Sequence, residues 1–277
     1  MSDIPALYWL VVAAAAAIIG WLVCGPLLRS RRRRRQLSAE FPARWRALLE
    51  RKLPLYARMP VDLRLRLHGL INAFIAEKNF VGCAGQAIDD EVRLLIAAQA
   101  CLLVLNDGRG LFDELEAILV YPSAILVDEE YADDAGIVTS ARHELLGRAW
   151  DAHQIILSWE DVLEDGTSEH PEQNVVLHEF AHQLDQSGGP AEGAPALGSS
   201  ARYARWSAVM QEAYDALQAQ VDRGEPAWMD EYGASDPAEF FAVATESFFI
   251  DARGLRQAQP ALYAELSDLY GLDPAAW

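Results

Sequence analysis

The chain has 277 residues, enough for one or two domains with a sizeable buried core. It contains 23 Lys and Arg against 41 Asp and Glu, which gives a formal net charge of −18. This acidic balance excludes a surface that binds nucleic acid by neutralising its phosphates. The three cysteines form no C-x-x-C pair, which argues against a disulfide framework.

The N-terminal region predicts a membrane anchor. Residues 4–28 include no charged residue, and their 25 positions exceed the length of about 20 that a helix needs to cross a bilayer. Arg29 and Arg31 to Arg35 follow directly, whereas only Asp3 precedes the apolar run. The positive-inside rule therefore predicts a single-pass protein of the inner membrane, with its N-terminus outside and its C-terminal part in the cytoplasm. A cleaved signal peptide, the alternative, carries its positive charge before the apolar run.

Charge and composition divide the chain into two predicted parts. Residues 1–35 form the transmembrane anchor and a basic stop segment, and residues 36–277 form one domain without internal repeats. The domain holds 17 basic and 40 acidic residues, a net charge of −23. The arginine cluster could attract anionic lipid head groups, although its role as a topology signal is the simpler interpretation.

The hydrophobic pattern of the domain predicts an α+β fold, mostly helical with a small sheet. Residues 37–52 form a basic amphipathic stretch that could lie on the membrane or pack onto the domain. The strand at 154–159 could border a cleft and pair with an extended substrate, or could be an ordinary core strand. The other predicted elements are a strand at 117–121 and helices at 63–75, 88–105, 203–221 and about 237–249.

Residues 178–182 form the motif H-E-x-x-H within an apolar segment. Positions four apart share one helix face, so His178 and His182 point toward the same place. Two neutral imidazoles can hold Zn²⁺, and the carboxylate of Glu179 can act as a general base toward a water molecule there. The alternative is a helix with two incidental histidines, but the apolar setting and a suitable third ligand downstream favour a metal site.

A third protein ligand must come from elsewhere in the chain. The metzincin pattern would place a histidine at position 188, which is a glycine, so that class is excluded. Glu239 and Glu246 are seven residues apart and share a helix face. Asp236 and Pro237 could instead make Glu239 part of a capping box, and Glu246 could pair with an arginine. Spacing alone leaves the ligand role open between the two glutamates.

Two stretches carry a resemblance to a known family. HEFAHQLD at 178–185 and the sequence from Trp228 to Val243, which includes S-D-P-A-E, closely resemble the Mlc titration factor A family of zinc-dependent, gluzincin-like peptidases. The similarity extends over about residues 70 to 275. It implies a zincin-like metallopeptidase domain with one Zn²⁺ per chain. The implied metal ligands are His178, His182 and Glu239. The resemblance also implies that Glu179 is the catalytic base and that Tyr232 assists catalysis.

Two further acids have less defined expected roles. Asp185 follows His182 by three residues and could orient a ligand imidazole through its second nitrogen, or could lie exposed on the helix surface. Once Glu239 is taken as the ligand, Glu246 is expected beside the metal ligands or near the amino end of a substrate.

Together these features predict a membrane-tethered zinc-dependent peptidase. The alternative is a regulatory binding protein that sequesters a transcriptional repressor or another cytoplasmic partner, with peptidase activity secondary, because the family is named for titrating such a regulator. The full ligand set and Glu179 favour the enzyme, since sequestration requires neither. The sequence does not distinguish an aminopeptidase from an endopeptidase.

Overall fold

A computed structural model describes residues 28–106, 110–123, 153–169, 171–187 and 192–277, with Ala15, Gly25 and the pairs 131–132 and 138–139. The chain groups into two compact units, Met1–Glu40 and Phe41–Trp277. In the first unit, residues 28–37 are helical. The anchor predicted at 4–28 lies outside the described residues, apart from three positions. Among the residues that are described, no helix is both long and apolar enough to cross a membrane.

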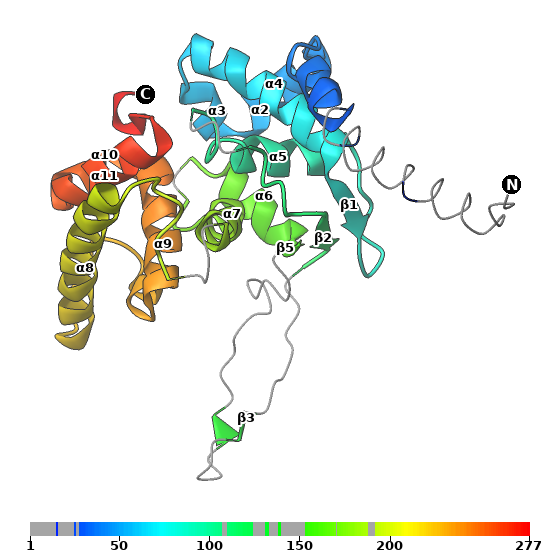
Figure 1. Ribbon diagram of the computed structural model, residues 1–277. Helices are drawn as coiled ribbons and strands as arrows, with labels where there is room; N and C mark the ends of the chain where they lie inside the picture. Colours follow the sequence, from blue (N-terminus) through cyan, green and yellow to red (C-terminus); the bar gives the residue numbers. More distant parts are fainter. Residues whose placement is uncertain are drawn as a thin grey trace, which may run out of the picture. The chain divides into compact units, whose positions relative to one another are not determined.

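The second unit contains a small parallel sheet (Figure 1). Its strands are β1 (Asn79–Gly82), β2 (Ala117–Tyr121) and β5 (Gln154–Ser158), in the order β1-β2-β5. A separate antiparallel pair consists of β3 (Tyr131–Ala132) and β4 (Val138–Thr139). The predicted strand at 117–121 is confirmed, and the one at 154–159 ends one residue earlier.

Helices make up most of the second unit, so the prediction of a mostly helical domain with a small sheet is confirmed. The α-helices are α2 (Ala43–Lys52), α3 (Pro54–Arg58), α4 (Val61–Glu77), α5 (Asp90–Ala100), α6 (Trp159–Thr167), α7 (Val175–Gln186), α8 (Ser200–Asp222), α9 (Pro237–Ile250), α10 (Ala252–Ala258) and α11 (Pro260–Tyr270). Two short 3₁₀ helices are η1 (Glu231–Ala234) and η2 (Pro274–Ala276).

Polar N-caps fix where several of these helices begin. In each case a side-chain oxygen accepts a hydrogen bond from a backbone N–H of the first turn, which would otherwise lack a partner. The capping residues are Asp89, Ser158, Asn174, Ser199 and Asp236. Asp236 caps α9 with Pro237 in the first turn, as the sequence predicts.

The predicted end of one helix is wrong. Helix α5 ends at Ala100, because residues 101–106 turn instead of continuing the helix. Within the predicted amphipathic stretch 37–52, the chain leaves the helical conformation after residue 37, and α2 starts only after Pro42. Leu49 of α2 is fully buried, and the indole Nε1 of Trp45 donates to Asp90 at 2.9 Å. The apolar side of α2 therefore packs onto the domain and not onto a membrane.

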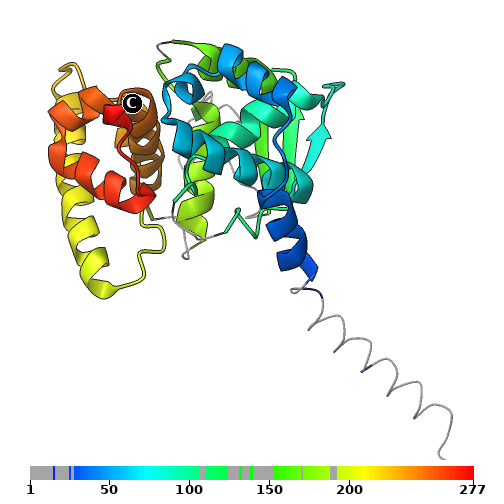
Figure 2. The same ribbon diagram turned by 90° about the horizontal axis from the view of Figure 1, so that it is seen from above.

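The helix that carries the H-E-x-x-H motif, α7, lies at the centre of the second unit. It contacts α9 extensively and also touches α5, α6 and β5. Seen from above, the yellow-to-red helices α8 to α11 gather on one side of it, and the sheet with the lighter-blue and cyan helices α2 to α4 lies on the other (Figure 2). Val176, Leu177 and Phe180 are fully buried in this packing. The motif is thus held between two helical groups.

A buried histidine on α4 should make the stability of the domain depend on pH. His68 stacks on Phe41 with ring centroids 4.0 Å apart, and its Nε2 lies 2.7 Å from the hydroxyl of Tyr56. Burial, with smaller effects of Arg46 and Arg64, lowers the pKa of His68 to about 4. The unfolded chain therefore binds the proton at a higher pH than the folded chain does.

The contribution of neutral His68 to the free energy of unfolding should accordingly be at its maximum above about pH 6.5. It should decrease as the pH drops from there toward 4. Between pH 7 and pH 5 the contribution of His68 is expected to be about 1 kcal/mol. Urea unfolding of wild type and His68→Gln at both pH values measures it. An unchanged pH dependence in the variant would show that His68 remains solvated.

Candidate metal centre

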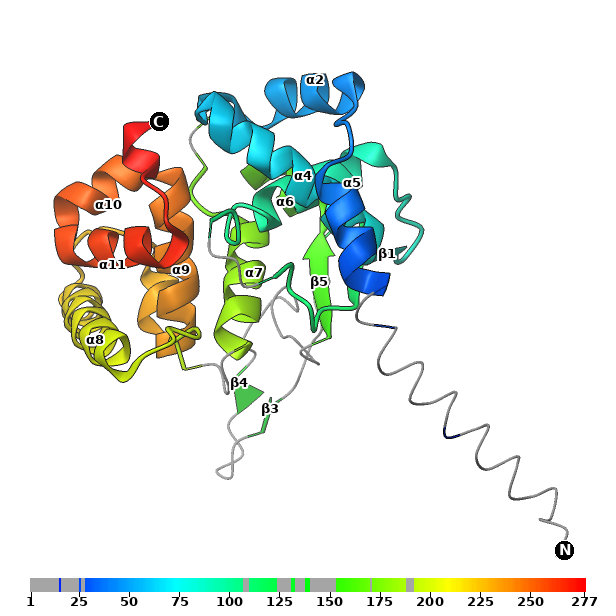
Figure 3. The ribbon, with the colours of Figure 1, turned by 45° about the horizontal axis from the view of Figure 1, so that its top comes forward.

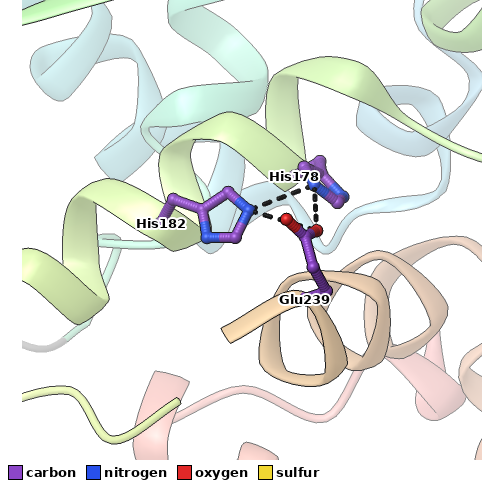
Figure 4. A group of neighbouring side chains, drawn as sticks. All are labelled: His178, His182 and Glu239. Carbon is purple, nitrogen blue, oxygen red and sulfur yellow. Dashed lines mark hydrogen bonds and ion pairs between the residues drawn. The ribbon is translucent and has the colours of Figure 1, made fainter. Parts of the chain in front are cut away.

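Three side chains from two helices meet at one point (Figure 4). His178 and His182 come from α7, and Glu239 comes from the first turn of α9. The two Nε2 atoms are 3.2 Å apart, and Oε2 of Glu239 lies 3.0 Å from that of His178 and 3.4 Å from that of His182. The structure thus brings together the three residues that the resemblance implies as ligands.

The spacing of these atoms fits a metal ion. Tetrahedral coordination with bonds of about 2.0 to 2.1 Å places ligand atoms about 3.3 Å apart, close to all three separations. Oε2 of Glu239 is buried, and no well-aligned hydrogen bond reaches it from the described residues. A buried carboxylate oxygen in this state requires a cation or a donor. The donor set of two imidazoles and one carboxylate suits Zn²⁺ with a fourth position left open.

Glu246 lies behind the first histidine. Its Oε1 is 2.7 Å from Nδ1 of His178, and its Oε2 accepts the backbone N–H of Asn174. A proton shared between Nδ1 and the carboxylate leaves the lone pair of Nε2 directed at the ligand cluster. Because Glu246 is itself buried, this contact also satisfies a carboxylate that would otherwise be costly in an apolar helix.

A buried polar network holds the N-terminus of α7 behind this contact. The Nδ2 group of Asn174 donates to Oε1 of Gln99 on α5 at 2.6 Å, and Asn174 Oδ1 accepts from Leu177 N–H. The carboxylate of Asp165 on α6 accepts from Val175 N–H at 2.9 Å. Helices α5, α6 and α9 therefore all fix the start of the metal-site helix.

Sequence reasoning missed Gln99, Asn174 and Asp165. A usable signal existed for Asn174, which stands immediately before an apolar helix where an N-cap is expected. Gln99 interrupts an apolar helix, which indicates a buried polar partner without saying which one. That Gln99 pairs with Asn174, 75 residues away, follows only from the packing of α5 against α7.

The electrostatics of the site are dominated by burial and by the carboxylates around His178. Burial by itself would lower the pKa of His178, but its contacts with Glu239 and Glu246 raise it well above the usual range. Burial acts to raise the pKa of Glu239, yet the two imidazoles hold it well below the usual range.

Glu179 lies on the same helix, one residue from the first ligand, with only 4% of its surface exposed. Burial raises the pKa of Glu179 to about 8, while His178 acts to lower it. A bound divalent cation would act in the same direction as the charged imidazole, favouring the carboxylate form that can accept a proton.

Tyr232 belongs to η1 and lies over the ligand cluster. Its ring centroid is 6.1 Å from that of His178, and 44% of its surface is exposed. Burial and the neighbouring Glu239 raise the pKa of Tyr232 to about 12, so the hydroxyl stays protonated at neutral pH and remains a hydrogen-bond donor.

Asp185 is buried at the C-terminal end of the same helix. Its two carboxylate oxygens accept the backbone N–H groups of Gly193 and Ala194 at 2.7 and 2.8 Å. Gly193 has a φ of 73°, and a Cβ atom there would lie 2.3 Å from the carbonyl oxygen of Pro237. Asp185 therefore ties α7 to a segment that touches the first turn of α9. Its predicted role toward a ligand imidazole stays a prediction.

This geometry is consistent with the metal site of a metallopeptidase, in which two histidines lie one helical turn apart and a glutamate comes from a later helix. The comparison with known proteins agrees. Residues 28–271 match the family described as Glucose-regulated metallo-peptidase M90, and the chain belongs to this family. The resemblance to Mlc titration factor A is thereby confirmed.

Relatives are similar over most of their length. An uncharacterised protein of Synechocystis sp. is 36% identical over 266 residues, which are 96% of this chain and 97% of that protein. Mlc titration factor A of Pectobacterium atrosepticum is 34% identical over 235 residues, 84% of this chain and 87% of that protein. The protein of that name from Yersinia enterocolitica is 32% identical over 244 residues, covering 87% and 90%.

Metal content should separate the two glutamates of α9. Glu239→Ala removes one of three ligand atoms and should abolish zinc binding, as His182→Ala should. Glu246→Ala leaves all three ligands in place and should weaken zinc affinity about 10- to 100-fold, because His178 loses the partner that orients it. Zinc titration of the purified metal-free variants measures both effects. Unchanged affinity in Glu239→Ala would remove that residue from the site.

Proposed function

We propose that this protein is a zinc-dependent peptidase whose metal is held by His178, His182 and Glu239. The observation that carries the proposal is the convergence of three ligand atoms at separations of 3.0 to 3.4 Å. Membership of a metallopeptidase family supports it. A zincin-like arrangement, with the acid beside the first histidine, accounts for the position of Glu179.

When bound, Zn²⁺ supplies Lewis acidity that polarises a peptide carbonyl and makes a water molecule more acidic. Glu179 takes the proton from the attacking water and later delivers it to the leaving amine. The hydroxyl of Tyr232 donates a hydrogen bond to the carbonyl oxygen as that oxygen gains negative charge. Glu246 keeps the imidazole of His178 in the orientation that the site requires.

Substitution of Glu179, the proposed base, should lower the rate of peptide hydrolysis without changing zinc binding. Glu179→Gln preserves the shape of the side chain and contributes no ligand, so zinc content should stay near one per chain. Peptide hydrolysis should fall about 100-fold or more, because an amide cannot accept the proton of the attacking water. Tyr232→Phe should have a smaller effect, since base and metal remain.

The measurements are zinc content, thermal unfolding and initial rates on a peptide library, with wild type and Gln211→Ala, an exposed position on α8, as controls. Glu179→Gln with wild-type rates and full zinc would refute the assignment of Glu179 as the base.

The names of the relatives favour a second candidate function. Two proteins similar to this chain are called Mlc titration factor A, a name that describes the titration of Mlc. This chain could accordingly be a regulatory binding protein that sequesters a transcriptional regulator, with peptidase activity secondary. The same variant distinguishes the two functions, because Glu179→Gln should abolish the cellular effect of a peptidase but leave that of a sequestering protein intact.

We also propose that residues 4–28 anchor the protein in the inner membrane, with the catalytic domain in the cytoplasm. The support is the uncharged run followed by six arginines. A reporter fused after Trp277 should behave as cytoplasmic. Neutralising Arg29 and Arg31 to Arg35 should produce mixed orientation. Cleavage of the C-terminal reporter by protease added to intact spheroplasts would contradict this topology.

A further inference from the structure

The basic residues of the chain are concentrated near its start, and they continue well beyond the arginine run. Residues 29–66 hold 13 basic and three acidic residues. Residues 67–277 hold ten basic and 37 acidic residues. Seven of the 13 lie in 41–66, within the compact second unit. The domain therefore has one strongly basic segment, while the rest of it is strongly acidic.

The same segment exposes apolar side chains. Val61 and Leu65 are one turn apart on α4, and 68% and 62% of their surfaces are exposed. In the described part of the second unit, the other large apolar side chain with comparable exposure is Tyr232 at the metal site. Exposed apolar residues scattered singly are ordinary. Here two of them stand one helical turn apart within the basic segment.

Three arginines of this segment form no hydrogen bond or ion pair among the residues that the structure describes. They are Arg46, Arg51 and Arg58, and all three are exposed. By contrast, Arg64 links α4 to α2 through Glu50 at 3.9 Å. Figures 1 and 3 both show α2 next to α4 and well apart from α8.

We propose that Arg46, Arg51, Arg58, Val61 and Leu65 form a docking surface that rests on an anionic lipid bilayer. Basic side chains attract acidic head groups, and the apolar pair can enter the boundary between head groups and acyl chains. The acidic remainder of the domain is repelled by the same lipids. Docking therefore fixes which side of the catalytic domain faces the membrane.

This inference rests on the proposed anchor, because the anchor limits how far the basic segment can lie from the membrane. Phe41 follows Arg35 by six residues, a stretch that reaches at most about 20 Å when extended. If the arginine run lies at the cytoplasmic face of the bilayer, residues 41–66 must start close to that face. Tethering keeps the surface at high effective concentration, so weak individual contacts are sufficient.

The test uses the full chain in lipid vesicles, with a fluorophore on Leu65→Cys. Cys24→Ser and Cys83→Ser remove the other reactive thiols, and Cys101 is fully buried. A lipid-borne quencher should quench the fluorophore in vesicles that contain phosphatidylglycerol, and much less in phosphatidylcholine alone or at high salt. The same label at Ala216→Cys, an exposed position on α8, should stay unquenched.

A matched pair of charge variants tests the surface itself. Arg51→Gln with Arg58→Gln should reduce the ratio of docked to free domain by about fivefold per arginine. Arg223→Gln with Arg256→Gln changes the net charge equally at exposed positions elsewhere and should have no effect. Equal loss in both pairs would show that total charge decides, and would overturn the proposed surface.

Flotation of the chain with vesicles separates docking from anchoring. Flotation with neutral vesicles supports the anchor, and absence of quenching at residue 65 in floated anionic vesicles then overturns docking alone. If the chain floats only with anionic vesicles and residue 65 is quenched, the anchor fails and docking stands.

Discussion

The site depends on one buried contact, that between the carboxylate of Glu246 and Nδ1 of His178. A carboxylate inside an apolar helix is costly unless it is paired, and an imidazole holds a metal more tightly when a partner fixes its other nitrogen. The contact satisfies both requirements. Packing of α7 on α9 brings the two side chains together, so the fold and the metal site share the same interaction.

Helix α9 supplies a carboxylate to each of the two ring nitrogens of His178. Glu239 and Glu246 are seven residues apart and project from the same helix face, so the first reaches Nε2 of His178 and the second reaches Nδ1. Asp236 caps the helix through its own side chain, which leaves the carboxylate of Glu239 available to the cluster. One helix thus supplies a candidate metal ligand and also the carboxylate that contacts the other nitrogen of His178.

The network around Asn174 ties the start of α7 to the neighbouring helices. Asn174 joins Gln99 of α5 to Glu246 of α9 through its side chain and its backbone N–H, and it caps α7. Because each partner comes from a different helix, a shift of any one of them would alter the direction of His178. Preorganisation of this kind is what a site needs in order to act on a substrate.

The sequence by itself determined the helical spacing of His178 and His182, the acid beside the first, and the helical character of the segments that carry them, because these are local properties of periodicity and capping. It also showed that Glu239 and Glu246 share a face, but spacing could not choose between them as ligand. Only the tertiary structure distinguishes the two, by packing α9 along α7 so that Glu239 meets both Nε2 atoms while Glu246 meets Nδ1 of His178. The short strand β1 and the hydrogen bond between Gln99 and Asn174 could likewise not be predicted from the sequence. Both depend on contacts between segments far apart in the chain.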